Sequence, residues 1–279
     1  MLKTISLDKI INKPSSEKLS PNNSLFKNLL FYKNNINETN EWDNYKKLTN
    51  KYELIYLPNK KNRNNSIAFY KPLSRSYFKM WELIHDFNIL NNSNPITILC
   101  LAEGPGGFME AIFNYRKTNN IYDVIYGITL NSEKKDVPGW KASHKLLRNK
   151  NIKITYGIDN TGNLYNCENI IGLSKTLKDK ASLITADGGF DFSQDFNKQE
   201  ELSYRIIFCE IVSALLNQKT EGHFICKIFD INTILTYKML YILRMYYTEV
   251  YITKPHTSRP ANSEKYIVCK DFKGISDIH

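Results

Sequence analysis

Hydrophobic positions along the chain fall into two kinds of pattern, continuous apolar runs and residues at helical spacing. The runs are typical of buried strands and lie at 96–102, 122–129, 152–156, 182–186 and 223–229. Between them, helical spacing predicts helices near 107–117, 140–148, 168–178, 199–217 and 232–246. This alternation predicts an α/β domain with a mostly parallel sheet and helices on both faces.

The two ends of this region depart from the alternation. Before the first strand, apolar residues at helical spacing predict a helix over 74–88, with Ser74 as its N-cap. After the last helix, residues 249–254 and 266–270 predict two strands separated only by a loop. A connection without a helix makes neighbouring strands antiparallel, so the sheet is expected to end in an antiparallel hairpin.

The first 66 residues differ in composition from the rest. They are polar and rich in Asn and Lys, with short apolar pieces at 25–32 and 52–57. We therefore predict an N-terminal extension at 1–66 that packs on a single larger domain at 67–279, which is a usual size for one α/β domain.

Composition restricts the partners and the compartment. The chain has 38 basic and 28 acidic residues, a formal charge of +10, which favours a polyanionic partner. Abundant Lys, Asn and Ile are equally consistent with an AT-rich genome. No apolar run predicts a membrane span, and the N-terminus lacks a secretory signal. The five cysteines form no CxxC pair, so we expect buried free thiols and an intracellular, reducing compartment.

The first strand ends in the sequence Gly104-Pro105-Gly106-Gly107. In doubly wound sheets, ligands bind beyond the carboxyl ends of the strands, beside the turn after the first one. Glycines there let the backbone approach a ligand closely. The turn predicts a nucleotide-like cofactor, although a purely structural turn would have the same composition. It lacks the GxGxxG spacing of dinucleotide-binding proteins.

Four charged residues are candidates for chemistry. Asp187 follows a buried strand and precedes two glycines, and Lys227 lies within an otherwise apolar strand. Glu264 precedes the final antiparallel strand, which brings it to the same edge, and Lys79 lies in the helix before the first strand. Taken singly, each has a structural explanation: a capping aspartate, a lysine that extends to solvent, or a solvated loop.

Together these segments resemble one family of enzymes. The matching blocks are at 74–79, 101–108, 127–130, 157–162, 186–190, 226–230 and 257–269. They are similar to FtsJ-type (RrmJ-like) ribose 2′-O-methyltransferases, in particular to the eukaryotic and viral enzymes that methylate mRNA caps. The similarity covers about residues 70–272. It implies a class I methyltransferase (Rossmann-like) fold, S-adenosyl-L-methionine as cofactor and the capped 5′ end of mRNA as partner.

The resemblance also implies roles for individual residues, and no metal site. The catalytic set is Lys79, Asp187, Lys227 and Glu264. The cofactor-binding residues are Ala102, Glu103, Gly104, Pro105, Gly106, Gly107, Phe108, Thr129, Leu130, Asp159 and Asp187. Of these, Thr129 and Leu130 are expected beside the adenosine, and Asp159 is expected to contact the adenine. The substrate-binding residues are Arg75, Ser258, Arg259 and Asn262. Two positions depart from the family pattern: Glu103 replaces a small residue, and Thr129 replaces an acid.

Several alternatives stay open from the sequence. Lys227 either removes the 2′-hydroxyl proton as a neutral amine or stabilises the oxyanion as an ammonium ion. The substrate is either cap-proximal mRNA or ribosomal or transfer RNA. A non-catalytic RNA-binding subunit would share the fold. Whether the protein needs a partner from the capping machinery also stays open. A dinucleotide-dependent oxidoreductase is disfavoured by the terminal hairpin. The location expected for mRNA modification is the nucleus or cytoplasm, including a viral factory or virion.

Overall fold

A computed structural model describes residues 4–6, 24–36, 39, 41–57, 65–134, 137–189 and 198–275. The strands are β1 (Thr4–Ser6), β2 (Thr97–Leu101), β3 (Val124–Ile128), β4 (Ile152–Thr155), β5 (Ala181–Ala186), β6 (Gln218–Ile228), β7 (Tyr247–Thr253) and β8 (Lys265–Phe272). The helices are α2 (Ser24–Asn35), α3 (Trp42–Leu48), η2 (Glu53–Ile55), α4 (Ser76–Phe87), α5 (Gly107–Thr118), η4 (Trp140–Ala142), α6 (His144–Leu147), α7 (Cys167–Thr176), α8 (Gln199–Asn217) and α9 (Ile234–Tyr246).

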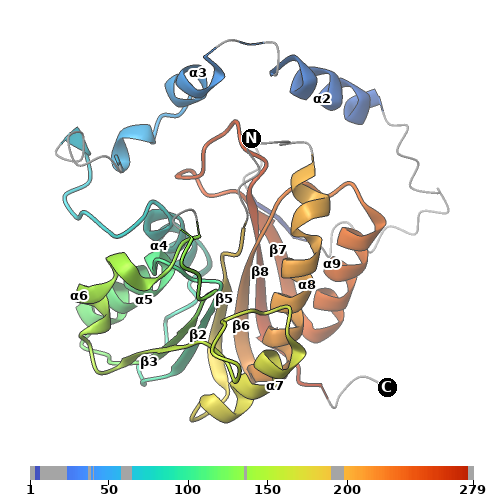
Figure 1. Cartoon of the computed structure of the whole chain (residues 1–279). Helices are drawn as coiled ribbons and strands as arrows, with labels where there is room; N and C mark the ends of the chain where they lie inside the picture. Colours follow the sequence, from blue (N-terminus) through green and yellow to red (C-terminus); the bar gives the residue numbers. More distant parts are fainter. Residues whose placement is uncertain are drawn as a thin grey trace.

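The strands form one mixed sheet in the order β1-β7-β8-β6-β5-β2-β3-β4 (Figure 1). Strands β2 to β6 run parallel to one another, while β8 is antiparallel to both β6 and β7. The predicted α/β fold with a terminal antiparallel hairpin is therefore confirmed. The sheet order adds a feature that the sequence did not predict, because β8 inserts between β6 and β7.

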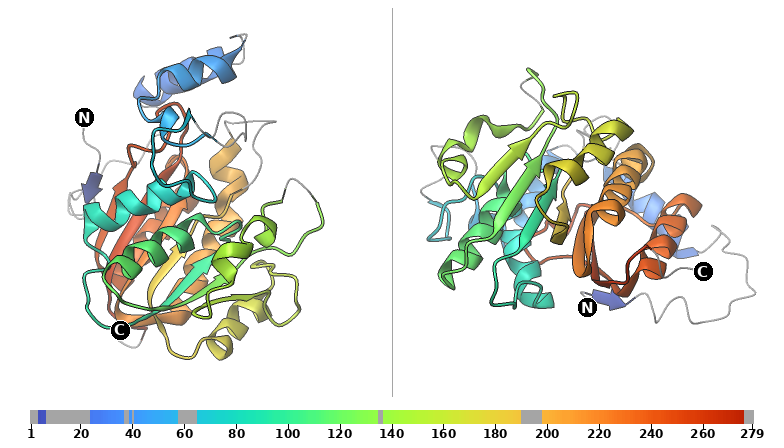
Figure 2. Two further views of the ribbon diagram at one scale, coloured as in Figure 1. Left: turned by 90° about the vertical axis from the view of Figure 1, so that its left-hand side faces the viewer. Right: turned by 90° about the horizontal axis from the view of Figure 1, so that it is seen from below.

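Helices cover the sheet on both faces (Figures 1 and 2). On one face, α4 and α5 pack on the sheet through residues such as Met80 and Ile112. On the other, α7, α8 and α9 contribute Leu173, Ile211 and Leu243. Each helix places its apolar stripe against strands that are buried on both sides, which explains why those strands read as continuous apolar runs.

The N-terminal region contacts the rest of the chain at several points. Strand β1 pairs antiparallel with β7 at the edge of the sheet. Helices α2 and α3 arch over the end of the sheet where the loop between β7 and β8 lies (Figures 1 and 2). Lys33 of α2 forms an ion pair with Asp230, which follows β6. The division of the chain at residue 66 remains a prediction, and many residues of the extension lie outside the described ranges.

Three details of the prediction were wrong. The segment at 140–148 forms two short pieces, η4 and α6, that meet at Ser143 instead of one helix. Helix α4 begins at Ser76 with Arg75 at the N-cap, and Ser74 makes no side-chain cap because its hydroxyl pairs with that of Ser76. Cys167 is exposed at the start of α7, whereas Cys100, Cys226 and Cys269 are buried as expected.

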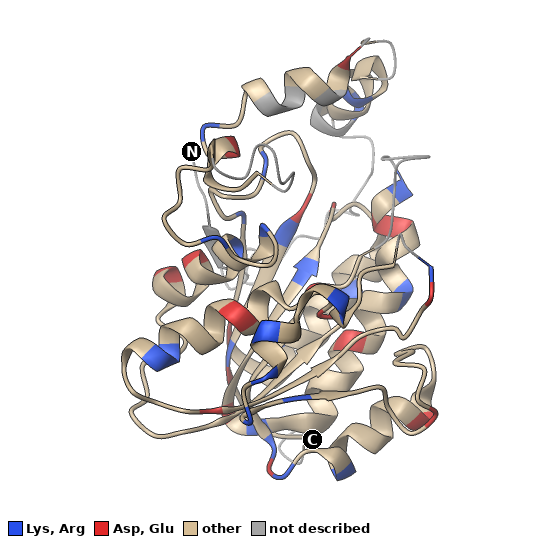
Figure 3. Cartoon of the chain, turned by 60° about the vertical axis from the view of Figure 1, so that its left-hand side comes forward, with Lys and Arg blue, Asp and Glu red and all other residues tan. Residues whose placement is uncertain are grey.

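Basic and acidic residues are interspersed along the helices and loops of the chain (Figure 3). In the ranges that the structure describes, no helix is long and apolar enough to cross a membrane.

Candidate functional site

The four candidate catalytic residues come from four elements that meet at the carboxyl edge of the parallel strands. Asp187 directly follows β5, and its backbone N–H donates to the carbonyl of Leu101 at the end of β2, at 3.4 Å. Lys227 lies near the end of β6, opposite Tyr266 of β8. Glu264 directly precedes β8, and Lys79 lies in the first turn of α4.

The four side chains form two ion pairs. Lys227 Nζ lies 3.3 Å from Asp187 Oδ1 and donates to the backbone carbonyl of Asp187 at 2.9 Å. Lys79 Nζ lies 2.7 Å and 2.8 Å from the two carboxylate oxygens of Glu264. All four side chains are at most 17% exposed. The structure thus brings together the four residues that the sequence places in separate segments.

Their charges reinforce one another. Burial is the largest influence on the pKa of Lys227 and lowers it, but Asp187, Glu264 and Glu210 outweigh it and raise the pKa above its ordinary value. Burial also opposes ionisation of Glu264, yet Lys79 and Lys227 lower its pKa to about 2. Lys227 and Glu264 are therefore charged at neutral pH, which favours the ammonium role of Lys227 over the base role.

Two further residues complete the site, and the sequence analysis assigned neither. The hydroxyl of Tyr266 donates to Asp187 Oδ1 at 3.0 Å. Glu210 of α8 is fully buried behind Asp187 and accepts hydrogen bonds from the Gly188 N–H at 3.1 Å and the Cys226 thiol at 3.6 Å. Burial raises the pKa of Glu210 to about 8. A signal for it existed: Glu210 interrupts the apolar stripe of α8.

The position of Glu210 explains why the residue directly after Asp187 is a glycine. A Cβ at Gly188 would collide with Glu210 Oε1, so a side chain there would displace the buried carboxyl. Gly188 therefore permits a close approach within the protein. Phe190, the end of this block, lies outside the described residues.

The turn predicted to bind the cofactor connects β2 to α5. Ala102 and Gly106 both have positive φ, at 49° and 104°, and the Gly104–Pro105 peptide is cis. Gly107 and Phe108 begin α5, and the Phe108 ring is buried at 5.9 Å from the Tyr266 ring. Phe108 therefore contributes backbone to the turn and a side chain to the core.

Glu103 is the unusual residue of this turn. Its Oε1 accepts the backbone N–H groups of Phe108 and Met109 at 2.9 Å and 3.1 Å, so it satisfies the start of α5. Its Oε2 is buried without a hydrogen-bond partner among the described residues. Burial, assisted by the charge of Asp187, raises the pKa of Glu103 well above its usual range. Burial thus favours the protonated form of Glu103 beside the turn.

The predicted adenosine side lies after β3 and β4. Thr129 is buried, while Leu130 is 44% exposed and offers an apolar surface. Asp159 is exposed, but its carboxylate accepts bonds from Thr161, Asn166 and Asn169. These bonds lower the pKa of Asp159 below its usual range. Asp159 therefore stabilises its own loop, and its contact with adenine stays a prediction.

These groups suit the predicted cofactor. A sulfonium donor carries positive charge, and Asp187 provides a carboxylate beside the end of β2, where the glycine turn begins. The orphaned Glu103 Oε2 adds a second oxygen near it, and Leu130 supplies an apolar surface for a base. Among the described residues, no cluster of His, Cys, Asp and Glu side chains could hold a metal ion.

The loop between β7 and β8 carries three of the predicted substrate residues. Ser258 is buried, and its hydroxyl donates to Glu264 Oε1 at 2.8 Å. Asn262 is exposed and is held by Lys254, whose Nζ lies 2.8 Å from its Oδ1 and also contacts the Glu264 carbonyl at 2.8 Å. Burial lowers the pKa of Lys254 to about 8. Lys254, which no sequence pattern singled out, thus fixes the loop from within.

The two predicted substrate arginines contact the N-terminal region. Arg259 donates to both carboxylate oxygens of Glu53 at 2.6 Å and 2.8 Å. Arg75 donates to the carbonyls of Tyr52, Glu53 and Thr257 at 2.9 Å, 3.2 Å and 3.2 Å. No sequence pattern predicted this arrangement, because Glu53 lies in a segment without a recognisable motif.

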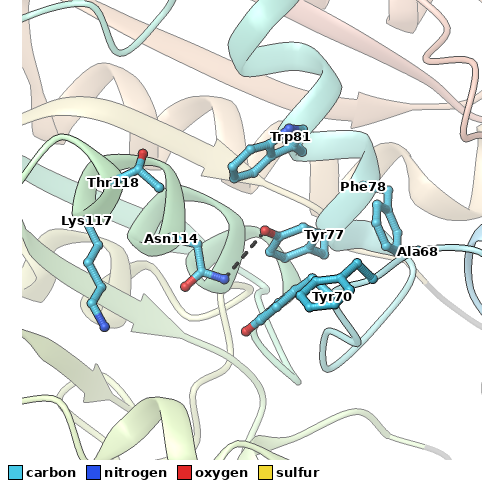
Figure 4. Close-up of a pocket in the computed structure, with 9 residues that line it drawn as sticks. Ala68, Tyr70, Tyr77, Phe78, Trp81, Asn114, Lys117 and Thr118 are labelled. Atoms are coloured by element: carbon cyan, nitrogen blue, oxygen red, sulfur yellow. Dashed lines mark hydrogen bonds between the residues drawn. The ribbon is translucent and has the colours of Figure 1, made fainter.

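A separate cavity of about 660 Å³ lies between α4 and α5. Its lining consists mainly of aromatic residues: Ala68, Phe69, Tyr70, Tyr77, Phe78, Trp81, Asn114, Lys117 and Thr118. Figure 4 shows the Tyr77 hydroxyl facing Asn114, at 3.5 Å. None of the predicted site residues lines this cavity, so its residues provide controls for variants of the site.

The fold and the site together define a Rossmann-like methyltransferase whose sheet ends in an antiparallel hairpin. The model of the FtsJ-like methyltransferase family matches residues 72–272, and the chain belongs to that family. The solved structure of a Plasmodium falciparum protein assigned as a ribosomal RNA methyltransferase superimposes with a TM-score of 0.53. The superposition covers 72% of this chain and 98% of that one at 20% identity, which supports the fold alone.

Curated relatives share more of the sequence. The chain is 38% identical over 175 residues to cap-specific mRNA (nucleoside-2′-O-)-methyltransferase 1 of Trypanosoma cruzi, covering 61% of this chain and 46% of the relative. It is 37% identical over 186 residues to the human protein of the same name, covering 64% and 22%. The chain thus spans less than half the length of these relatives.

Proposed function

We propose that this protein methylates a ribose 2′-hydroxyl of RNA, at the cap-proximal nucleotide of mRNA, with S-adenosyl-L-methionine as donor. The observation that carries the proposal is the convergence of Lys79, Asp187, Lys227 and Glu264 on one edge of a methyltransferase sheet. Membership of the FtsJ-like family and the names of the curated relatives support it.

The cofactor would lie along the turn at 102–108, with its base toward Thr129 and Leu130 and its cationic end toward Asp187. When bound, it supplies an electrophilic methyl group on sulfonium sulfur. Asp187 is oriented for this contact by Tyr266 and Lys227, which both lie at Oδ1. Asp159 shapes the loop that closes the adenosine side.

The lysines would act on the acceptor oxygen. As an ammonium ion, Lys227 donates a hydrogen bond to the 2′-oxygen and stabilises negative charge as the hydroxyl proton leaves for water. Glu264 raises the pKa of Lys227 and pairs with Lys79, so it would hold both lysines near the oxygen. The 2′-oxygen must also lie in line with the methyl–sulfur bond, so positioning by this cluster supplies much of the rate.

The substrate is the part of the proposal that an experiment decides most directly. We would measure transfer of labelled methyl from S-adenosyl-L-methionine to matched RNAs that carry an N7-methylated cap, an unmethylated cap or a 5′-triphosphate. The same assay would include ribosomal and transfer RNA. We expect methylation of capped RNA at the first or second nucleotide. Preferential labelling of ribosomal or transfer RNA would replace the cap assignment, and no labelling of any RNA would contradict the activity.

The substrate also bears on location and partners. Methylation of mRNA caps would take place in the nucleus, in the cytoplasm or in a viral factory, beside other proteins of the capping machinery. Co-purification of the tagged chain with guanylyltransferase activity tests the protein partner.

A further inference from the structure

Residues 50–57 form an ordered segment between the N-terminal helices and the methyltransferase domain. Asn50 is buried, and its side chain donates to Glu53 Oε2 at 2.7 Å. The Tyr56 hydroxyl donates to the Leu73 carbonyl at 3.0 Å, and the Leu57 N–H donates to the Ser66 hydroxyl at 2.9 Å. The segment is therefore fixed against the start of the methyltransferase domain.

The carboxylate of Glu53 faces the loop between β7 and β8, which carries Arg259. Its two oxygens accept the Nε–H and one terminal N–H of Arg259, a side-on pair that fixes the plane of the guanidinium. The hydrogen bond from Arg259 is the largest influence on the pKa of Glu53 and lowers it to about 2. Glu53 is thus ionised throughout the neutral range. Its side chain is 12% exposed and that of Arg259 is 33% exposed.

Arg75 joins the same cluster from the other side. Its Nε–H donates to the Thr257 carbonyl, while its terminal nitrogens donate to the carbonyls of residues 52 and 53. It also lies 3.6 Å from Glu53 Oε2. One guanidinium therefore ties residues 50–57 to the loop between β7 and β8.

The balance of charge in this cluster is informative. Two guanidinium ions and one carboxylate leave a net charge of +1, which still suits an RNA phosphate. Without the Glu53 charge, Arg75 and Arg259 would repel each other across the same space. The carboxylate therefore allows two cations to lie together beside the loop between β7 and β8.

We propose that Glu53 is a positioning residue for RNA: through its side-on pair it holds Arg259, beside Arg75, in the orientation that contacts a backbone phosphate. Residues 50–57 are then one wall of the RNA site and not a detachable extension. The inference rests on the proposed function for the identity of the substrate. The chemistry itself is separate, because Glu264 is held independently by Lys79 and Ser258.

The test uses the full chain and the variant Glu53→Gln, which keeps the shape and removes the charge. We expect the KM for capped RNA to rise about tenfold, with kcat and the Kd for S-adenosyl-L-methionine within about twofold of the parent. Glu41→Gln, at an exposed acid of the same N-terminal region, is the matched control and should leave KM unchanged.

A double-mutant cycle separates positioning from simple folding of the segment. If Glu53 acts through Arg259, Glu53→Gln adds little to the KM of Arg259→Ala, and the two effects are non-additive. Additive effects, or a parallel fall in kcat, cofactor affinity and Tm, would overturn the inference. So would tighter RNA binding by Glu53→Gln, because Glu53 would then compete with phosphate.

The inference and the proposed function fail in different ways. RNA affinity is measured separately by fluorescence anisotropy with a capped oligonucleotide, which needs no turnover. An inactive parent protein that binds this oligonucleotide, and binds it about tenfold more weakly as Glu53→Gln, would contradict the methyl transfer and support the positioning role. Methyl transfer to capped RNA with the same KM in the parent and in Glu53→Gln would support the proposed function and contradict the positioning role.

Discussion

The protein has two clusters of charged residues, an inner cluster at the edge of the sheet and an outer cluster that includes the N-terminal region. Both combine basic side chains with carboxylates, but they serve different purposes. In the inner cluster, Lys79, Asp187, Lys227 and Glu264 are almost buried, and each comes from a separate element of the sheet domain. In the outer cluster, Arg259 is 33% exposed, whereas the side chains of Arg75 and Glu53 are as buried as those of the inner cluster.

The difference lies in what holds each cluster together. The inner pairs are set by strand ends and helix starts, so their geometry follows from the fold. The outer cluster needs a residue from outside the sheet domain, because its carboxylate belongs to Glu53 of the N-terminal region. We infer that the chemistry is built into the fold, whereas the hold on RNA is completed by the extension.

The sharpest test of the inner cluster is removal of its central lysine. Lys227→Ala should lower methyl transfer by about a thousandfold or more, because the ammonium that stabilises the oxyanion is lost. S-adenosyl-L-methionine binding, measured by calorimetry, should stay nearly unchanged. Lys117→Ala, at an exposed lysine beside the aromatic cavity, is the control. Substantial turnover by Lys227→Ala would remove Lys227 from the mechanism.

Asp187→Ala should affect binding and transfer together. It removes the carboxylate that faces the cationic end of the cofactor and leaves Lys227 and the Tyr266 hydroxyl without their shared acceptor. We expect about a hundredfold loss of transfer at saturating cofactor and at least a tenfold rise in the Kd for S-adenosyl-L-methionine. An unchanged Kd would show that the cationic end is held elsewhere.

Stability against pH tests the buried acid behind the inner cluster. The pKa of Glu210 is raised to about 8 by burial, so the folded protein binds a proton there that the unfolded chain releases above about pH 4.5. This contribution to stability is full below pH 4.5 and is lost as the pH rises toward 8, at up to about 1.36 kcal/mol per pH unit. Glu210→Gln removes it.

The comparison to make is between parent and Glu210→Gln in urea unfolding at pH 5 and pH 8. The free energy of unfolding of the variant should improve relative to the parent as the pH rises. Asp86→Asn, on exposed α4 surface, should show no such change. A difference between parent and Glu210→Gln that is constant with pH would mean that Glu210 is ionised in the folded protein.

The smallest effect on activity is expected for Asp159, at the edge of the predicted cofactor site. Asp159→Asn should raise the KM for S-adenosyl-L-methionine about threefold, because the loop that it ties through Asn166 and Asn169 loosens. The kcat should stay the same. A loss of kcat as large as that of Asp187→Ala would show that Asp159 contributes to methyl transfer itself and not only to cofactor binding.

Much of the fold could be predicted from the sequence. Strand β5 and helix α8 lie within one residue of their predicted bounds, because buried parallel strands and long amphipathic helices leave strong periodic patterns. The single helix predicted for 140–148 was wrong, because a short polar region offers little periodicity. The insertion of β8 between β6 and β7 was also out of reach, since strand order depends on long-range packing.

The site divides in the same way. The order of strands and turns predicted that Asp187 and Lys227 share an edge, because parallel strands end together. The pKa of Lys227 could not be predicted, since burial and three carboxylates oppose each other there and only the distances decide the outcome. Glu210 was detectable in principle as an acid in an apolar stripe, but its partner at Gly188 was not.

By itself, the sequence determined the alternating sheet domain, its terminal hairpin, and the four charged residues at one edge, because local patterns and chain order specify them. Tertiary structure decided which charges pair, which acids stay neutral, and that Glu53 reaches Arg259 from about 200 residues away. These depend on burial and on distances of a few ångströms between segments far apart in the chain, where electrostatic interactions change most steeply.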